Sequence, residues 1–227
     1  MTRLGPIRLT SKPAALVAAT LVVTALLVML RSGDRTTASE PQPAPVTTPA
    51  PPLLPSRAVG LPFAGRLVRG LQLPAEGTDF FTWDPVLKRF PNRGWRRWGT
   101  DRLLHTIATV LTEYRTLHPG APRVGIADLS RPHGGNFGPR YGGRGHASHQ
   151  NGLDVDVCYP RRDGLERAPR SPAVIDLGLA QDLLNLFVDA GAQYVFVGPH
   201  VRLHGPRRIV QPLAFHDDHM HVRISHP

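Results

Sequence analysis

The chain has 227 residues, 41% of them hydrophobic, and a formal net charge of +10 from 27 basic and 17 acidic side chains. This length allows one generous globular domain with extra segments rather than two full domains. The single cysteine, Cys158, excludes an internal disulfide bond. The positive charge favours anionic surroundings such as nucleic acid, phospholipid or a cell-wall polymer. With 7% aromatic residues and no arginine-rich helix, nucleic acid is the weakest of these partners.

An uncharged apolar stretch runs from Pro13 to Leu30, directly after three basic residues, Arg3, Arg8 and Lys12. As a helix it would span ~27 Å, close to the ~30 Å core of a bilayer. The positive-inside rule then leaves the N-terminus cytoplasmic and the remainder outside. Residues 1–31 are therefore predicted to be a membrane anchor or a signal segment, and cleavage of the segment would make the protein secreted. The long apolar run, with no small-residue cleavage motif directly after it, favours the anchor.

Residues 32–58 are rich in proline, with seven prolines between Pro41 and Pro55. Such a segment cannot bury a core and is predicted to be a disordered, extended linker, reaching ~45 Å over its proline-rich part. An anchor followed by a stiff spacer would hold a domain of residues 59–227 at a distance from the membrane. That layout fits work on an extracytoplasmic polymer.

From residue 59 onward the hydrophobic pattern is that of a folded domain. Apolar residues recur at helical spacing over residues 101–117, with a cap at Thr100 or Asp101, and again over residues 176–190. β-rich runs predict strands at residues 123–129, 153–158, 193–197 and 219–224. Helices and strands do not alternate regularly, so we expect an α+β fold with a small, mainly antiparallel sheet flanked by helices.

Histidines gather in two regions of this domain. They are His133, His146 and His149 in the first region, and His216, His219 and His221 in the second. Side chains of a strand alternate between its faces, so His219 and His221 share one face of their strand. By the same rule Asp154 and Asp156 share a face in the run LDVDV.

If these two strands are neighbours, Asp156 meets an imidazole of the H-x-H pair, and His149 can fold over from its loop to join them. Two imidazoles and one carboxylate form a three-ligand zinc site with a fourth position open for water, as in catalytic zinc centres. Zn²⁺ would lower the pKa of that water toward ~7 and polarise a scissile carbonyl. Each motif alone is also compatible with surface histidines and a strand-end turn, but their coincidence favours a metal site.

The stretches SHQNGLDVDV and HDDHMHVRI resemble the metal motifs of the penicillin-insensitive murein endopeptidase family. This family belongs to a wider metallopeptidase group that includes lysostaphin-type enzymes, D-Ala-D-Ala peptidases and the hedgehog domain. The upstream DLSRPHGG also resembles the family's approach to its first motif. The resemblance runs from about residue 59 to the C-terminus. It implies a compact sheet flanked by helices, and an enzyme that hydrolyses peptide cross-links between peptidoglycan stems.

The resemblance also implies which residues hold the metal. His149, Asp156 and His221 match the family's zinc ligands. His146 matches a histidine just before the first ligand, in or near the metal sphere. The family has members with several cysteines, and any disulfide framework that they use is missing here, since Cys158 is alone.

Further residues are candidates for catalysis and binding. By resemblance, His219 matches a base or oxyanion-stabilising position, and His216 a supporting histidine. Asp218 is an alternative base, but alternation from His221 points it to the other face of the strand. Asp154 is expected to orient a ligand or stabilise the nearby loop. Arg131 is a candidate for binding a stem carboxylate or the developing oxyanion, with a solvated loop arginine as the alternative.

The sequence therefore predicts a membrane-tethered, zinc-dependent endopeptidase of the periplasm or cell wall that acts on peptidoglycan stem peptides. One alternative is a D-Ala-D-Ala carboxypeptidase with the same site chemistry and a different groove. Another is a non-catalytic, zinc-stabilised wall-binding module. Against that module stand His219 and His216, since a purely structural site gains from a fourth protein ligand.

Overall fold

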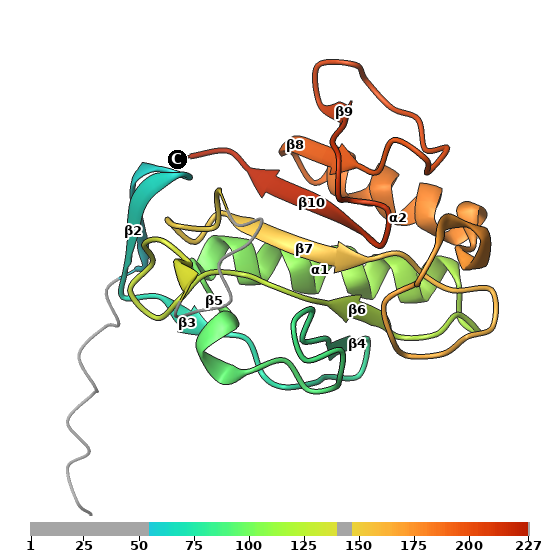
Figure 1. Ribbon diagram of the computed structural model, residues 1–227, viewed down its shortest axis with the longest axis horizontal. Coiled ribbons are helices and arrows are strands. Elements are labelled where there is room, and N and C mark those ends of the chain that lie inside the picture. Colours follow the sequence, from blue (N-terminus) through green and yellow to red (C-terminus); the bar gives the residue numbers. More distant parts are fainter. Residues whose placement is uncertain (1–54, 140–146, 227) are drawn as a thin grey trace, which may run out of the picture. The chain divides into compact units, whose positions relative to one another are not determined.

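The computed structural model describes residues 55–139 and 147–226 (Figure 1). The predicted anchor, residues 1–31, and most of the predicted linker lie outside the described residues. Within the described part of the chain, no helix has the length and apolar character needed to cross a membrane.

The described residues form two α-helices, two short 3-10 helices and ten strands. The helices are α1 (Asp101–Leu117), α2 (Leu177–Asp189), η1 (Gly94–Arg96) and η3 (Pro172–Val174). The strands are β1 (Arg57–Leu61), β2 (Ala64–Val68), β3 (Leu71–Gln72), β4 (Phe80–Thr82), β5 (Trp98–Gly99), β6 (Val124–Ile126), β7 (Asp154–Cys158), β8 (Ala192–Val197), β9 (Val210–Pro212) and β10 (His219–Ile224). Both predicted helices and all four predicted strands are present, with end shifts of one residue except in β6, which is shorter than predicted.

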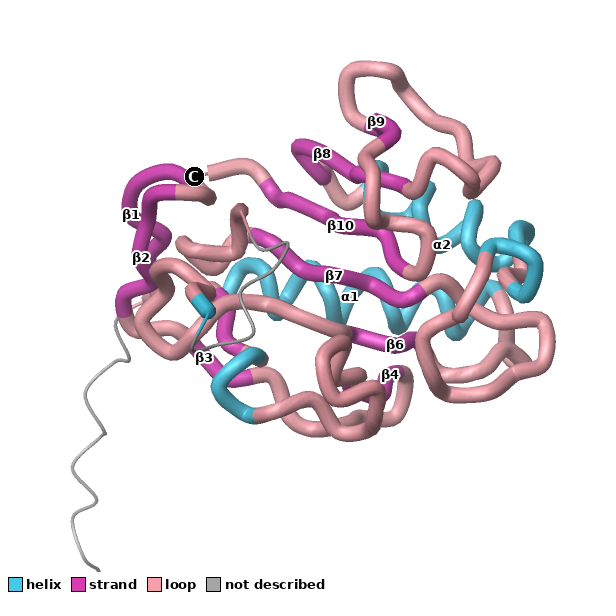
Figure 2. Tube along the Cα trace, viewed as in Figure 1, coloured by secondary structure: helices cyan, strands magenta, loops and turns pink. Residues whose placement is uncertain are grey.

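A six-stranded sheet in the order β4-β6-β7-β10-β8-β9 forms the centre of the domain (Figure 2). Its three central pairings, β6-β7, β7-β10 and β10-β8, are antiparallel. Its two edge pairings, β4-β6 and β8-β9, are parallel. The α+β class is confirmed, and the sheet is mixed because strands at both edges run parallel to their neighbours. Two small two-stranded sheets, β1-β2 and β3-β5, accompany it.

Helices α1 and α2 pack behind this sheet, on the same face (Figures 1 and 2). Helix α1 buries a stripe at helical spacing, made up of Leu103, Ile107, Val110, Leu111 and Tyr114. Full burial of each such side chain stabilises the fold by about 1.5–3 kcal/mol. The helix begins at Thr100, whose side chain accepts a hydrogen bond from the Leu103 amide. Thr100 also donates its backbone N–H to Gly152 O over 3.0 Å, which ties the helix start to the loop before β7.

The strands β7 and β10 have one apolar and one polar face. Val155 and Val157 of β7 join Met220 and Val222 of β10 in the core under the helices. The alternate residues of both strands, which carry the carboxylates and imidazoles, therefore lie on the face away from the helices. All five residues of β7 are buried, so its two aspartates lie in the interior.

A buried ion pair stabilises the segment next to β7. Arg96 and Asp128 are both fully buried, and Arg96 Nε lies 2.6 Å from Asp128 Oδ1. Asn92 Nδ2 donates to the same carboxylate oxygen over 3.0 Å. The Asp128 carbonyl in turn accepts the Asp156 amide over 2.8 Å. The ion pair therefore fixes the backbone that lies beside the centre of β7.

Replacing Asp128 by Ala should lower the free energy of unfolding by about 3–5 kcal/mol, because Arg96 would remain buried without its carboxylate. Urea denaturation of the full-length chain, followed by circular dichroism, measures the change. Glu166→Ala is the matched control, because Glu166 pairs with Arg123 at the surface. The control substitution should lower the free energy of unfolding by less than about 1 kcal/mol. An equal decrease in the free energy of unfolding in the two variants would contradict the structural role of the buried pair.

Candidate functional site

The register of β7 and β10 brings their polar residues into direct opposition. His221 pairs with Asp156, and Arg223 pairs with Asp154. Directly opposed residues of an antiparallel pair have their Cβ atoms about 4.5–5.5 Å apart, on the same face of the sheet. The two strands are thus neighbours, which was the condition for joining the two motifs.

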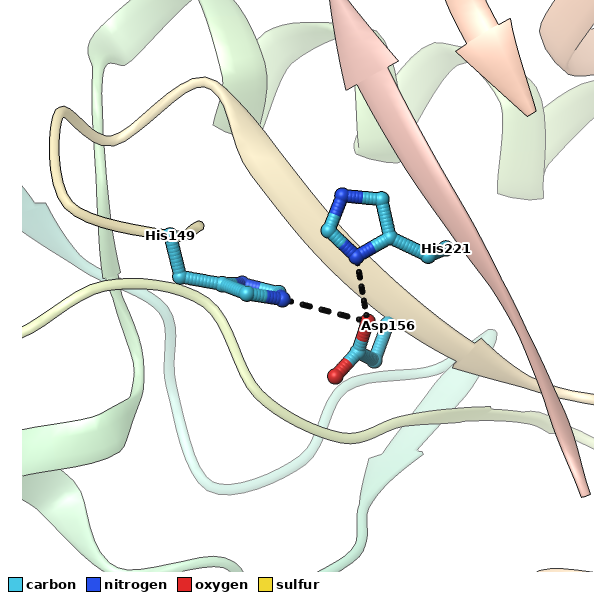
Figure 3. A group of neighbouring side chains, drawn as sticks. All are labelled: His149, Asp156 and His221. Atoms are coloured by element: carbon cyan, nitrogen blue, oxygen red, sulfur yellow. Dashed lines mark hydrogen bonds and ion pairs between the residues drawn. The ribbon is translucent and has the colours of Figure 1, made fainter. Parts of the chain in front are cut away.

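His149 reaches the same face from the loop before β7 (Figure 3). Its backbone adopts φ +65°, a left-handed conformation that costs a non-glycine residue about 1–3 kcal/mol. The next residue holds this loop in place: Gln150 N donates to Pro62 O over 2.9 Å, and Gln150 O accepts from Gly135 N over 2.9 Å. His149 is only 2% exposed as a result, and its ring lies edge-on to the His221 ring with centroids 4.6 Å apart.

The imidazoles of His149 and His221 converge on one carboxylate oxygen of Asp156, as the dashed lines in Figure 3 show. His149 Nε2 lies 3.3 Å and His221 Nδ1 lies 3.1 Å from Asp156 Oδ1. One ligand atom from each of the three residues lies within 4.8 Å of the other two. Two imidazole nitrogens and a carboxylate oxygen are a donor set that suits a divalent transition metal.

Asp154 contacts His221 on the side of its ring that faces away from Asp156, and Arg223 contacts Asp154. Asp154 Oδ1 lies 2.8 Å from His221 Nε2, and Arg223 Nε donates to the same oxygen over 2.6 Å. A proton on Nε2, facing Asp154, would leave Nδ1 as the ligand nitrogen when a metal is bound. This arrangement is how metal-binding histidines are usually oriented, by a carboxylate on the second ring nitrogen.

The cluster shifts the pKa values of Asp156 and His221. Burial alone would raise the pKa of Asp156, but the adjacent His149 and His219 hold it well below its ordinary value. Burial alone would lower the pKa of His221, but its contacts with Asp154 and Asp156 raise it to about 9. The carboxylate of Asp156 is therefore ionised and ready to bind a cation.

A second pair, His219 and Asp218, borders the three candidate ligands. His219 Nε2 lies 3.7 Å from Asp156 Oδ1, and His219 Nδ1 lies 2.6 Å from Asp218 Oδ1. Burial would lower the pKa of His219, but Asp156 and Asp218 raise it. Burial would raise the pKa of Asp218, but the hydrogen bond with His219 and the charge of Lys88 lower it.

Asp218 lies on the side of the candidate ligands, not on the opposite face that strand alternation predicts. The residue precedes β10, which begins at His219, so period-two alternation does not extend to it. Its side chain turns back to His219 and lines the same cavity as the candidate ligands. Asp218 is thus in direct contact with His219.

A cavity of about 370 Å³ opens over this cluster. His216 lines it, and the His216 and His219 ring centroids lie 4.7 Å apart. Burial and the neighbouring His219 lower the pKa of His216. Cys158 also lines the cavity and is buried against Trp83, as expected of a small apolar side chain.

Two further candidates stand apart from this cluster. Arg131 Nη1 donates to Asn136 O of its own loop over 2.8 Å, and Arg131 is not among the described residues that line the cavity. His146 lies outside the described residues. Trp83 and Phe215, which the sequence did not indicate, also line the cavity; Trp83 comes from a distant segment, and Phe215 directly precedes His216.

The model of the penicillin-insensitive murein endopeptidase family matches residues 58–173, about half of the chain. The matched range includes His149 and Asp156 and ends before β10. The chain belongs to this family.

Curated relatives carry the same family name. A penicillin-insensitive murein endopeptidase of Yersinia enterocolitica is 27% identical over 197 residues, covering 75% of this chain and 66% of the relative. One from Pectobacterium atrosepticum is 29% identical over 189 residues, covering 72% and 62%. The chain thus spans slightly less than two thirds of the length of these relatives.

The full-length chain should bind one divalent transition-metal ion in equilibrium dialysis, and His149→Ala or His221→Ala should abolish this binding by removing one of three ligands. Asp154→Asn should weaken it about 10- to 100-fold, because His221 loses the carboxylate that orients it. His105→Ala, on the exposed side of α1, is the control and should bind the metal normally. Undiminished binding by both His149→Ala and His221→Ala would place the metal elsewhere.

Proposed function

We propose that this member of the penicillin-insensitive murein endopeptidase family is a zinc-dependent endopeptidase that hydrolyses peptide cross-links of peptidoglycan. The observation that carries the proposal is the convergence of His149 Nε2 and His221 Nδ1 on Asp156 Oδ1, beside the His219–Asp218 pair. The names of the curated relatives support the same activity.

The donor set fits zinc. Structural zinc sites usually have four protein ligands, whereas catalytic sites have three and keep one position open. His149, Asp156 and His221 would hold the ion, and its open side would face the cavity that all three line. When bound, zinc supplies a Lewis acid that makes water more acidic and polarises a scissile carbonyl.

The neighbouring residues carry the proton transfers. Asp218 Oδ1 holds the proton on His219 Nδ1, which leaves His219 Nε2 to accept a proton from the attacking water. The same nitrogen then returns the proton to the departing amine. His216, beside the His219 ring, supports the developing oxyanion or the position of His219. Asp154 keeps His221 in its ligating tautomer.

The proposed site of action is extracytoplasmic, in the periplasm or cell wall, where the substrate lies. An anchor at residues 1–31 and a linker at residues 32–58 would place a catalytic domain of residues 59–227 near the polymer. The net charge of +10 suits a matrix that carries stem carboxylates.

Purified full-length chain should cleave cross-linked muropeptide dimers into monomers, lose this activity with a chelator and regain it when zinc is restored. Mass spectrometry of the products tests this and also separates endopeptidase from carboxypeptidase activity, which would release only a terminal D-Ala. Absence of metal-dependent cleavage across several types of cross-link would refute the proposal. Retained binding of peptidoglycan without hydrolysis would instead indicate a wall-binding module.

Replacing His219 by Ala should leave zinc bound and lower kcat by about 10²- to 10⁴-fold, since only the proton carrier is lost. Replacing His221 by Ala should remove both zinc and activity. Metal content by atomic absorption and turnover of muropeptide dimers are measured on the same samples, with His105→Ala as control. If His219→Ala also loses its zinc, the division between ligand and proton carrier is wrong.

A further inference from the structure

A second cavity of about 720 Å³ adjoins the cavity of the candidate site. The two cavities share four lining residues, which are Trp83, Ala168, Phe215 and Asp218. Of the described residues, the three candidate metal ligands line only the first cavity. The second cavity therefore meets the site on its Asp218 side, next to the proposed proton carrier His219.

Three cationic side chains line this second cavity: Lys88 from the loop after β4, and Arg167 and Arg170 from the loop after β7. Across residues 55–139 and 147–226, none of the three side chains forms a hydrogen bond or an ion pair. Arg167 Nε is even buried without an acceptor. A buried donor left unsatisfied costs about 1–3 kcal/mol, which an anion in the cavity would relieve.

Other cations nearby are neutralised within the fold. In the same loop, Arg161 Nε donates to Asp163 Oδ1 over 2.8 Å. Arg123 donates to Glu166 over 2.7 Å, which also ties this loop to the start of β6. The loop is thus anchored on both sides while the cations that line the cavity stay unpaired.

The two aspartates of the cavity are engaged elsewhere. Asp217 Oδ2 lies 2.7 Å from His200 Nδ1, and Asp218 Oδ1 lies 2.6 Å from His219 Nδ1. Among the described residues, neither carboxylate forms a hydrogen bond or an ion pair with the three cations. Lys88, Arg167 and Arg170 are therefore available to bind an anionic group of a ligand.

Backbone strain at the rim of the cavity points to a binding role. Lys88 and Phe215 both adopt left-handed backbone conformations, with φ of +53° and +67°. Such strain in a non-glycine residue is often found at ligand sites. Phe215 is 93% exposed where the two cavities meet, so its ring is an apolar surface for a ligand that spans both. Trp83 Nε1, on the shared wall, is a buried donor with no acceptor among the described residues.

We propose that the second cavity binds a free carboxylate on the residue whose amine is released, with Lys88 and Arg167 as the main contacts and Arg170 as the third. This inference rests on the proposed peptidase function. In that reaction the amide C–N bond breaks, the water oxygen stays on the acyl carbon, and the amine takes its proton from His219. The leaving residue therefore lies on the His219–Asp218 side, where the second cavity opens.

This position defines a substrate class. An amine whose own carbon bears a carboxylate, as in an α-amino acid, presents its anion two bonds from the scissile nitrogen. A carboxylate accepts paired, charge-assisted hydrogen bonds from an arginine. Amide cross-links in which the carbon attached to the scissile nitrogen carries no carboxylate, such as those formed by the ε-amine of a lysine side chain, should be cleaved more slowly.

Two matched peptides that differ only at the leaving residue test the inference: one with its α-carboxylate free and one with that group as a carboxamide. With the full-length chain and zinc, amidation should lower kcat/KM about 10- to 100-fold, as expected for loss of a hydrogen bond to a charged group. In the Lys88→Ala/Arg167→Ala double variant, the ratio of kcat/KM for the carboxylate peptide to kcat/KM for the carboxamide peptide should fall toward 1. The ratio is independent of the active enzyme fraction, so partial misfolding cannot imitate the effect.

Arg162→Ala is the matched control, because Arg162 belongs to the same loop and lines a different cavity. This variant should keep the wild-type ratio. A wild-type ratio near 1, with both peptides hydrolysed, would overturn the inference and leave the proposed function intact. A large ratio that the double variant preserves would overturn the assignment to this cavity. If neither peptide nor any muropeptide dimer is hydrolysed, the proposed function itself fails.

Discussion

The antiparallel register between β7 and β10 is the constraint on which the site depends. It sets His221 opposite Asp156 and Arg223 opposite Asp154. A shift of one residue in this pairing would turn every one of these side chains to the other face. The shift is prevented by the apolar alternates, including Val155 and Met220, which must stay in the core under the helices. The hydrophobic core on one face of the sheet thus fixes the geometry of the polar site on the other face.

Burial of so much charge needs compensation within the fold. Asp154 is fully buried and Asp156 is 5% exposed, which would be costly for ionised groups without partners. Asp154 has His221 and Arg223, and Asp156 has the imidazoles around it. A similar arrangement holds the neighbouring wall, where Arg96 pairs with Asp128 and lies over the Phe137 ring. These contacts compensate the charges that are buried on the polar face of the sheet.

Carboxylates in the site divide into one that faces the proposed metal and two that orient histidines. Asp156 faces the proposed metal position, Asp154 Oδ1 lies against Nε2 of His221, and Asp218 Oδ1 lies against Nδ1 of His219. A peptidase of the proposed kind needs this division, because a ligand must be held still while a proton carrier keeps one nitrogen free. The adjoining cavity of Lys88 and Arg167 would add recognition of the leaving residue on the side of the proton carrier.

The sequence alone determined the elements and much of the chemistry. Period-two alternation predicted the shared faces of Asp154 with Asp156 and of His219 with His221, and helical spacing predicted α1 and α2. Local periodicity could not show that β7 and β10 are neighbours, that edge strands pair in parallel, or that Asp218 turns back to His219. Nor could it find the second cavity, since Lys88, Arg167 and Phe215 come from three segments that share no motif. Only the tertiary structure decided these points, because they depend on contacts between residues far apart in the chain, and local sequence patterns carry no record of such contacts.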